Sequence, residues 1–317
     1  MNFCSIIIPF QNSSLTIKKC LNSAINQTGI VDYDIILIND YSVDNSSEII
    51  KKIIKKKTNC RMLYSTKRTV GPGHARNIGI KDSKSEYLFF LDSDDFLRTD
   101  ALINIKKANK KKVDLICCNY NVLDKVGNLK KKSRFDLSLY LLRKKIIIKN
   151  FFSLSIIPQV ISNLISRRLV SNNKIKFNNG YFEDIYFFFK VLFFSKKISI
   201  LKKKIYIKNN RKNSIVNSLS INHINDSFNN YYKCYLFSKK NKKYMKKLNL
   251  EYLFMHAVVG QVAVLIKRIK LLKINLYFRF LLERKIKSKY LTFKNIIKNH
   301  YKFKTKKDVI AKKFLYS

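Results

Sequence analysis

Hydrophobic and polar positions along the first 125 residues form blocks that predict a repeated strand–helix pattern. Short apolar runs predict strands at 5–10, 34–40, 61–66, 87–91 and 113–122. Between them, the sequence predicts helices at about 14–27, 44–54 and 100–111, and the segment 71–79 makes a turn and enters a further helix. Strands that alternate with helices form βαβ units. We therefore predict an α/β fold with a mostly parallel sheet and helices on both faces.

Polar side chains follow three of the predicted strands at the points where those strands end. The first strand ends near Pro9 and Gln11, the second at Asp40 and the fourth at Asp92. The carboxyl ends of parallel strands lie at one edge of the sheet, where ligands of such folds bind. We interpret this edge as a cleft for a nucleotide-type ligand.

Three carboxylates follow the apolar run 87–91 within four positions, in the sequence Asp92-Ser93-Asp94-Asp95. Carboxylates this close repel one another unless a cation lies between them. Their hard oxygen atoms suit Mg²⁺ or Mn²⁺, which proteins commonly share with substrate phosphates. For an isolated Asp-x-Asp, a helix N-cap in a solvated acidic turn is the more frequent explanation, so the remaining motifs decide between the two.

A second structured block contains a predicted helix near 137–152 and then Glu183 and Asp184, which directly precede the apolar run 185–189. An acidic first helical turn, stabilised by the helix macrodipole, explains these two carboxylates without any function. The alternative is a general base at the edge of an apolar wall, where desolvation raises the pKa of a carboxylate toward a useful range. From about residue 213 the pattern predicts basic helices.

The charge is strongly unbalanced, with 65 Lys and Arg residues against 20 Asp and Glu residues and a net charge of +45. AT-rich codon usage explains part of this excess, because Lys, Ile and Asn are all abundant. An anionic partner is the functional explanation. The basic residues are spread along the chain, which favours an anionic membrane surface over a dedicated nucleic-acid site. The segment 262–282 fits a packed helix pair with a solvated basic face and an amphipathic surface on anionic lipid equally well.

Cysteine usage and hydropathy indicate the compartment. The six cysteines show neither a CxxC pair nor zinc-ligand spacing, as expected in a reducing cytoplasm. The N-terminus begins directly with a strand-like segment, so we expect no signal peptide. The longest apolar segment, 253–266, is shorter than the roughly 20 residues of a membrane span. We expect a cytoplasmic protein that binds peripherally to the inner face of the cytoplasmic membrane.

Five motifs, taken in order, resemble those of the family 2 glycosyltransferases, which have the GT-A fold with a Rossmann-like sheet. They are Ser5-Ile-Ile-Ile-Pro-Phe-Gln-Asn12, Leu37-Ile-Asn-Asp-Tyr-Ser-Val-Asp44, Gly73-His-Ala-Arg-Asn-Ile-Gly79, Phe90-Leu-Asp-Ser-Asp-Asp95 and Phe182-Glu-Asp184. The resemblance covers about residues 1–215. It predicts a catalytic domain at 1–212, followed by a basic helical region at 213–317 that associates with the acceptor or the membrane.

The resemblance implies a role for each matched residue. Asp40 would contact the uracil base, and the residues implied in donor binding are Pro9, Phe10, Asn12, Asp40, Arg76, Asp92 and Ser93. Asp94, together with Asp92, would bind Mn²⁺ or Mg²⁺ at the donor diphosphate. Asp184 would be the catalytic base, with Glu183 beside it. With the base and the leaving group on opposite sides of the anomeric carbon, transfer inverts its configuration.

The chain departs from the family pattern in ways that bear on its substrate. Asn39 and Tyr41 stand where the family has Asp and Gly, which changes the ribose side of the pocket. The chain has no Trp, so it lacks the Gln-x-x-Arg-Trp motif of processive synthases. The resemblance therefore favours transfer of one sugar, in particular from a UDP-sugar, to a saccharide or lipid-linked acceptor. The implied process is the synthesis of a surface glycan such as lipopolysaccharide, lipooligosaccharide or capsule.

Three other functions compete with this prediction. A catalytically inactive scaffold of the same fold is one, but retention of all the acidic motifs argues against it. A nucleotidyltransferase would need a glycine-rich, basic phosphate loop, and the loop at 11–14 has neither Gly nor Arg. A basic nucleic-acid-binding protein fits the charge, yet no helix-turn-helix, RRM or zinc-finger signature is found. We therefore expect no nucleic-acid partner.

Overall fold

The computed structural model describes residues 1–123, 129–130, 136–209, 219–245, 247–272, 274–297 and 306–316. The chain divides into two compact units. The first comprises Met1–Leu142, Gln159–Asn179 and Lys190–Arg211, and the second comprises Arg143–Pro158, Gly180–Phe189 and Lys212–Ser317. The second unit thus contains the region predicted as separate after residue 212, together with two earlier segments of the chain.

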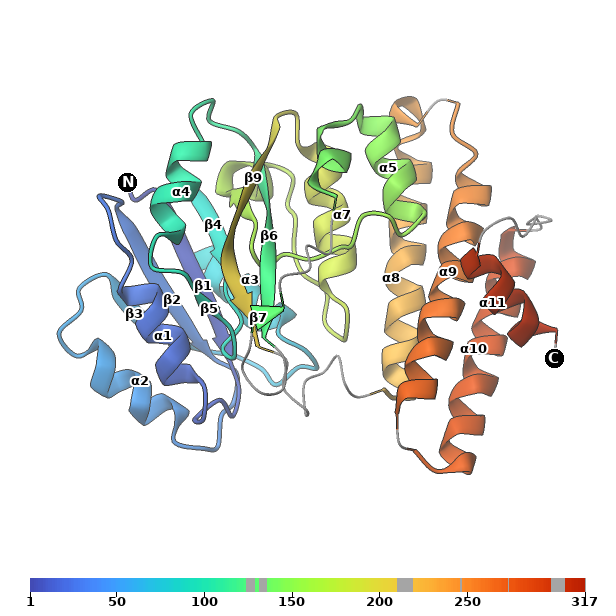
Figure 1. Ribbon diagram of the computed structural model, residues 1–317, viewed down its shortest axis with the longest axis horizontal. Coiled ribbons are helices and arrows are strands. Elements are labelled where there is room, and N and C mark those ends of the chain that lie inside the picture. Colours follow the sequence, from blue (N-terminus) through green and yellow to red (C-terminus); the bar gives the residue numbers. More distant parts are fainter. Residues whose placement is uncertain are drawn as a thin grey trace. The chain divides into compact units, whose positions relative to one another are not determined.

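The first unit is built on a mixed sheet (Figure 1). Its strands are β1 (Cys4–Phe10), β2 (Tyr33–Asn39), β3 (Cys60–Tyr64), β4 (Tyr87–Phe90), β5 (Phe96–Leu97), β6 (Leu115–Leu123), β7 (Leu129–Lys130), β8 (Leu164–Ser166) and β9 (Ile198–Lys208). They lie in the order β3-β2-β1-β4-β8-β6-β9-β5, with β7 beside β6. The predicted parallel arrangement holds for β3, β2, β1 and β4. Beyond β4, the pairs β4–β8, β8–β6 and β9–β5 are antiparallel, and only β6–β9 is parallel.

Helices cover both faces of this sheet because its central strands are buried on both sides. The helices of the first unit are α1 (Ile17–Ile25), α2 (Ser46–Ile54), α3 (Gly73–Asp82), α4 (Ala101–Ala108), the 3-10 turn η1 (Leu137–Leu141) and α6 (Arg167–Asn172). On one face, Ile6 and Ile8 of β1 join a core cluster that includes residues of α1 and α4. On the other face α3 packs closely, since a Cβ atom on Gly79 would lie 2.5 Å from Ile7 Cγ2. A glycine at this position therefore sets the distance between α3 and the sheet.

The second unit is helical. Its elements are α5 (Lys144–Phe152), the first six residues of α7 (Asp184–Phe194), α8 (Ile221–Lys240), the 3-10 turn η3 (Lys242–Tyr244), α9 (Leu250–Leu271), α10 (Leu276–Ile297) and α11 (Lys306–Leu315). Aromatic rings pack between these helices. The ring centroid of Phe151 in α5 lies 4.8 Å from that of Phe189 in α7, which lies 6.1 Å from that of Phe237 in α8. The single helix predicted near 137–152 is in fact η1 and α5, separated by an extended residue at Leu142.

Helix α9 is longer than the apolar run that predicted it. The helix has 22 residues and its most apolar 18-residue window has a mean hydropathy of 1.4, so it is long and apolar enough to cross a membrane. Our expectation from 253–266 that no segment reaches this length is therefore wrong, because the helix extends beyond that run at both ends. Of its most apolar window, 67% is buried inside the structure, where α9 contacts α8, α10 and α11. Core helices of this kind pass the same test of length and composition.

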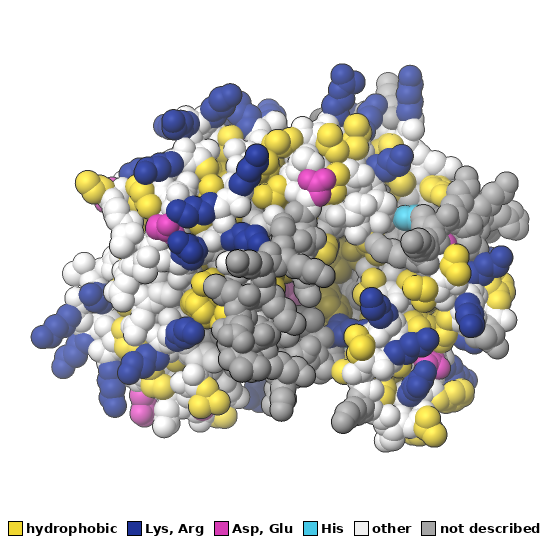
Figure 2. All heavy atoms as spheres, in the orientation of Figure 1, with side chains coloured by type: hydrophobic (Ala, Val, Ile, Leu, Met, Phe, Trp, Pro, Cys, Tyr) yellow, Lys and Arg dark blue, Asp and Glu magenta, His cyan; other side chains and the backbone are white. Residues whose placement is uncertain are grey.

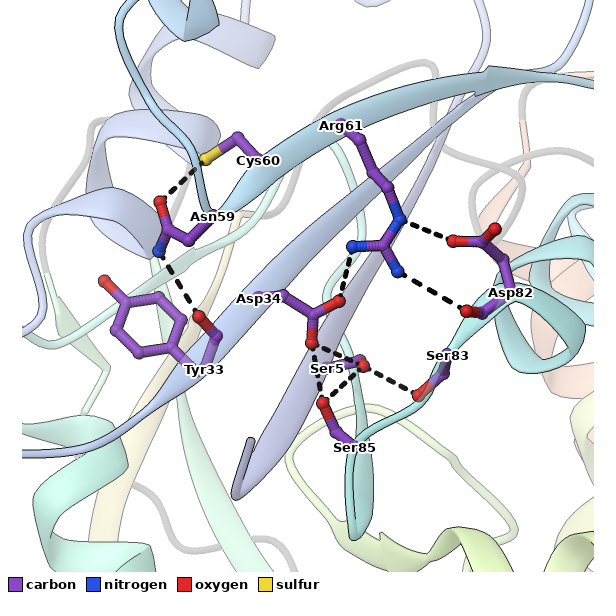
Figure 3. Close-up of polar contacts among 9 residues, drawn as sticks. All are labelled: Ser5, Tyr33, Asp34, Asn59, Cys60, Arg61, Asp82, Ser83 and Ser85. Carbon is purple, nitrogen blue, oxygen red and sulfur yellow. Dashed lines mark hydrogen bonds and ion pairs between the residues drawn. The ribbon is translucent and has the colours of Figure 1, made fainter. Parts of the chain in front are cut away.

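A buried polar network fixes the amino-terminal edge of the sheet, opposite the predicted site (Figure 3). Asp34 at the start of β2 accepts hydrogen bonds from Ser5 and Ser85, both at 2.7 Å. The same carboxylate forms an ion pair of 2.7 Å with Arg61 of β3, whose guanidinium also bonds to Asp82. This network joins β1, β2, β3, the end of α3 and the approach to β4, so it sets the register that aligns the other ends of these strands.

Replacing Asp34 with alanine should therefore destabilise the fold. The substitution leaves two buried serine hydroxyls without their acceptor and removes one of the two carboxylates that bind Arg61, which together correspond to about 2–4 kcal/mol. Urea unfolding followed by circular dichroism measures the loss in the free energy of unfolding. Asp32→Ala is the control, because Asp32 lies two residues away with an exposed side chain. Equal stability of the two variants would contradict the proposed structural role of Asp34.

Candidate functional site

The loops after β1 and β2 are tied together at the carboxyl edge of the sheet. Phe10 ends β1, and its carbonyl accepts a hydrogen bond of 2.8 Å from the backbone N–H of Asp40. Asn12 adopts a left-handed backbone with φ 47°. In that conformation its side-chain oxygen accepts a bond of 2.9 Å from the backbone of Val43, and its own N–H donates to Ser42. Pro9, which precedes Phe10 in β1, is buried and pairs with Ile38 of β2. The first two predicted motifs therefore form one rigid loop pair.

Asp40 is held in this loop pair with part of its carboxylate unused. The residue is 6% exposed, and Oδ1 has no hydrogen-bond partner among the described residues. Burial raises the pKa of Asp40, although Ser65, His74 and Arg68 oppose that shift. Buried polar atoms are nearly always paired in folded proteins. An unpaired buried oxygen at this edge is therefore available to a hydrogen-bond donor of a ligand.

Arg76 joins the third motif to the acidic turn. It lies on α3 with 4% exposure, and its Nη2 donates to Asp92 Oδ1 at 2.7 Å. The same guanidinium lies over the ring of Phe177, with 5.4 Å from Cζ to the ring centroid. A second contact to this turn comes from the first loop, where the Ser13 and Ser93 hydroxyls lie 2.8 Å apart. The structure thus brings Arg76 to Asp92 and the first loop to Ser93 in the same turn.

The acidic turn after β4 forms a compact cluster of three carboxylates. Oxygen atoms of Asp92, Asp94 and Asp95 all lie within 4.8 Å of one another. Asp92 and Asp94 are partly exposed, whereas Asp95 is buried. Burial and the neighbouring charge of Asp92 raise the pKa of Asp95 to about 8. The oxygen donors of this cluster fit a hard divalent cation such as Mg²⁺ or Mn²⁺.

The end of β9 completes this part of the site with residues that sequence reasoning missed. Tyr206 donates to Asp95 Oδ2 at 2.6 Å, and the backbone N–H of Asn209 donates to Asp95 Oδ1 at 2.7 Å. Burial alone would lower the pKa of the Lys208 ammonium, but the charges of Asp95, Asp92 and Asp94 outweigh that effect and raise it. Asp95 is thus the anchor of the turn. Asp92 and Asp94 are left as its more accessible carboxylates.

Glu183 and Asp184 lie in the second unit, at the start of α7. Glu183 is buried, and Phe182 before it has a left-handed backbone with φ 56°. The preceding loop is bound to α8. Asp226 accepts a bond of 2.9 Å from the Tyr181 backbone, and Asn230 donates to the carbonyl oxygens of Tyr181 and Phe182 at 3.2 and 3.1 Å.

Two further features restrain this loop. Gly180 has φ +104°, and a Cβ atom there would lie 2.6 Å from Asp226 Oδ2. The Tyr181 ring stacks on His223 of α8, with 3.6 Å between ring centroids. The loop that leads to Glu183 and Asp184 is therefore held by contacts within the second unit. The acidic first turn of α7 is real, and it is compatible with both explanations of the motif.

Comparison with known proteins places the first four motifs in a family. The family described as Glycosyl transferase family 2 matches residues 5–174. Poly(ribitol-phosphate) beta-N-acetylglucosaminyltransferase TarP of Staphylococcus aureus is 32% identical over 261 residues, which cover 77% of this chain and 76% of that protein. Cholesterol galactosyltransferase of Borreliella burgdorferi is 29% identical over 231 residues, which cover 69% of this chain and 63% of that protein. This chain therefore spans less than two thirds of the length of the second relative.

Solved structures show the same fold. S. aureus TarS 1–349 in complex with UDP-GlcNAc aligns with a TM-score of 0.62 and 18% identity, over 95% of this chain and 94% of that one. Mannosyltransferase PcManGT of Pyrobaculum calidifontis in complex with GDP-Man and Mn²⁺ aligns with a TM-score of 0.54 and 13% identity, over 99% and 87%. These likenesses confirm the predicted GT-A fold. Since the family match covers more than half of the chain and TarP is related over three quarters of it, the chain belongs to glycosyl transferase family 2.

Proposed function

We propose that this protein is an inverting, metal-dependent glycosyltransferase that moves one sugar from a UDP-sugar to a saccharide or lipid-linked acceptor. The observation that carries the proposal is the convergence, at one sheet edge, of the Asp40 carboxylate with its unpaired oxygen and the cluster of Asp92, Asp94 and Asp95. The first suits a hydrogen-bond donor of the nucleotide base. The second suits the diphosphate end of the same donor molecule. The UDP-GlcNAc in the TarS structure supports this choice of donor class.

The residues of the first unit would bind and orient the donor. Asp40 would accept a hydrogen bond from the uracil base, beside Pro9, Phe10 and Asn12. Asp94 and Asp92 would hold Mn²⁺ or Mg²⁺, and Arg76 fixes the orientation of Asp92 through their ion pair. A divalent ion bound there neutralises negative charge on the departing nucleoside diphosphate. Lys208, whose ammonium lies near the three carboxylates, would add positive charge beside the leaving group.

Asp184, with Glu183 beside it, would act on the acceptor. A hydroxyl group is a poor nucleophile until a base removes its proton. A carboxylate in that role releases the acceptor oxygen to attack the anomeric carbon from the side opposite the nucleotide. The bond to the new acceptor forms as the bond to the diphosphate breaks, so no covalent sugar–enzyme intermediate is required and the configuration inverts.

The acceptor and the location belong to the same proposal. We place the enzyme in surface-glycan synthesis, at the cytoplasmic face of the membrane. The name of the Borreliella relative indicates a lipid acceptor, and the name of the TarP relative indicates an anionic polymer. Basic side chains are spread over the visible face of the molecule, with few acidic ones among them (Figure 2). An anionic partner, whether acceptor or membrane, would be attracted to such a surface.

Replacing Asp40 with asparagine tests the proposed donor site. The loss of the carboxylate charge from the bond to the base should weaken UDP binding by about tenfold or more. Isothermal titration with UDP in the presence of Mn²⁺ measures the dissociation constant, and Asp32→Asn, exposed at the opposite edge of the sheet, is the control. A panel of nucleotide-sugars then identifies the donor by hydrolysis. If the wild-type protein binds no nucleotide-sugar of the panel, the proposal fails and the inactive scaffold replaces it.

A further inference from the structure

The turn between α9 and α10 exposes large hydrophobic side chains that the second unit does not use. Leu271, Leu276, Tyr277 and Phe280 are 78%, 82%, 72% and 58% exposed. All four lie within ten residues, at the end of one helix and in the first turns of the next. Single exposed hydrophobic residues are ordinary, but a contiguous group indicates an interaction surface.

The three of these side chains that lie on α10, Leu276, Tyr277 and Phe280, are outside the face of the helix that packs inside the unit. The buried face of α10 consists of Leu282, Ile286, Tyr290 and Phe293. These four recur at helical spacing and define one stripe. Leu276 and Phe280, four residues apart, lie on a second stripe about 105° away at 100° per residue. Helix α10 is thus apolar on two faces at its start, and only one of them is covered by the unit.

Basic residues are frequent in the sequence around this apolar end. From residue 267 to residue 289 the sequence has one acidic residue, Glu283, and nine basic ones: Lys267, Arg268, Lys270, Lys273, Arg279, Arg284, Lys285, Lys287 and Lys289. Lys267 and Lys270 are exposed, and the single acid is already bound to Arg279 at 3.0 Å. On this end of the helical unit, hydrophobic and basic side chains lie side by side (Figure 2).

We propose that the α9–α10 turn inserts into the surface of an anionic phospholipid bilayer. Leu271, Leu276, Tyr277 and Phe280 would enter the boundary between headgroups and acyl chains, and the surrounding Lys and Arg side chains would bind lipid phosphates. A second copy of the chain is a poor occupant, because it would bring the same excess of positive charge to the contact. The inference rests on the proposed membrane location, and it adds the surface that makes the contact.

Vesicle flotation tests the proposal with the full-length protein. Vesicles of equal parts phosphatidylglycerol and phosphatidylcholine should bind the wild type. The partition coefficient of the variant Leu276→Ser/Tyr277→Ser/Phe280→Ser should be lower by about tenfold or more, because the variant loses the burial of apolar side chains in the bilayer. The control is Leu291→Ser/Ile296→Ser/Val309→Ser. It alters side chains of α10 and α11 that are also exposed, at 52%, 50% and 67%, but lie outside the turn. The control should bind as the wild type does.

A tryptophan probe distinguishes insertion from simple attraction, because the chain has no Trp of its own. In the variant Phe280→Trp, vesicles should shift the fluorescence to the blue, and brominated lipids should quench it. In Val309→Trp they should do neither.

Vesicle binding without quenching at position 280 would overturn the proposal, and so would a switch from dimer to monomer in the serine variant, which would identify a second copy as the occupant. Nucleotide-sugar hydrolysis is assayed in parallel without vesicles. If the wild type hydrolyses its donor but does not float, the membrane surface is rejected while the proposed enzymatic function stands.

Discussion

Replacing Asp94 with alanine is expected to reduce metal-dependent hydrolysis of the donor sugar-nucleotide by about a thousandfold. Asp94 is a partly exposed carboxylate in a cluster whose oxygens lie within 4.8 Å of one another. Asp92 is bound to Arg76 and Asp95 is buried and bound to Tyr206, and the family resemblance assigns Asp94 as the direct metal ligand. The measurement is release of UDP from the panel donor at several Mn²⁺ concentrations, with water as the acceptor.

Two controls make this result specific. Asp100→Ala removes a carboxylate that binds Arg98 and Lys203 at the surface, and it should retain nearly full activity. Titration with UDP without metal shows whether Asp94→Ala still has its base-binding loops intact. If Asp94→Ala turns over at the wild-type rate while Asp92→Ala does not, Asp92 is the principal ligand and the assignment of Asp94 is wrong. Wild-type hydrolysis that is unaffected by EDTA would contradict metal dependence altogether.

The strands that the sequence predicted most clearly are those whose environment is uniform. Strands β1, β2 and β4 are apolar along nearly their whole length because both of their faces are buried. Strand β9 was not predicted, because Lys202, Lys203 and Lys204 interrupt its middle, where the strand is mostly exposed. Its buried residues, Ile205 and Tyr206, follow the lysines and give too short a pattern to indicate a strand.

The candidate site divides in the same way between local and distant information. The turn from Asp92 to Asp95 is one contiguous motif, so its carboxylates could be located from sequence. Tyr206 and Lys208 stand more than a hundred residues later, and they reach the turn only through the pairing of β5 with β9. No periodicity within either segment indicates that pairing. The same holds for Asp226, whose contact with the loop before Glu183 depends on how α8 packs.

Asp184→Asn is expected to slow donor hydrolysis by about a hundredfold to ten-thousandfold while the affinity for UDP stays unchanged. Asparagine keeps the size of the side chain but cannot accept a proton, and Asp184 lies in a different unit from the residues proposed to bind the nucleotide. The loop before it stays fixed by Asp226 and Asn230, so the substitution should not displace Glu183.

Comparison with Glu183→Gln decides which carboxylate is the base. A defect confined to Glu183→Gln would transfer the role to Glu183, and normal rates in both variants would mean that the acidic first turn of α7 serves only the helix. A rate defect in Asp184→Asn with unchanged UDP binding supports the proton-accepting role, because it places the defect in a step after the donor has bound.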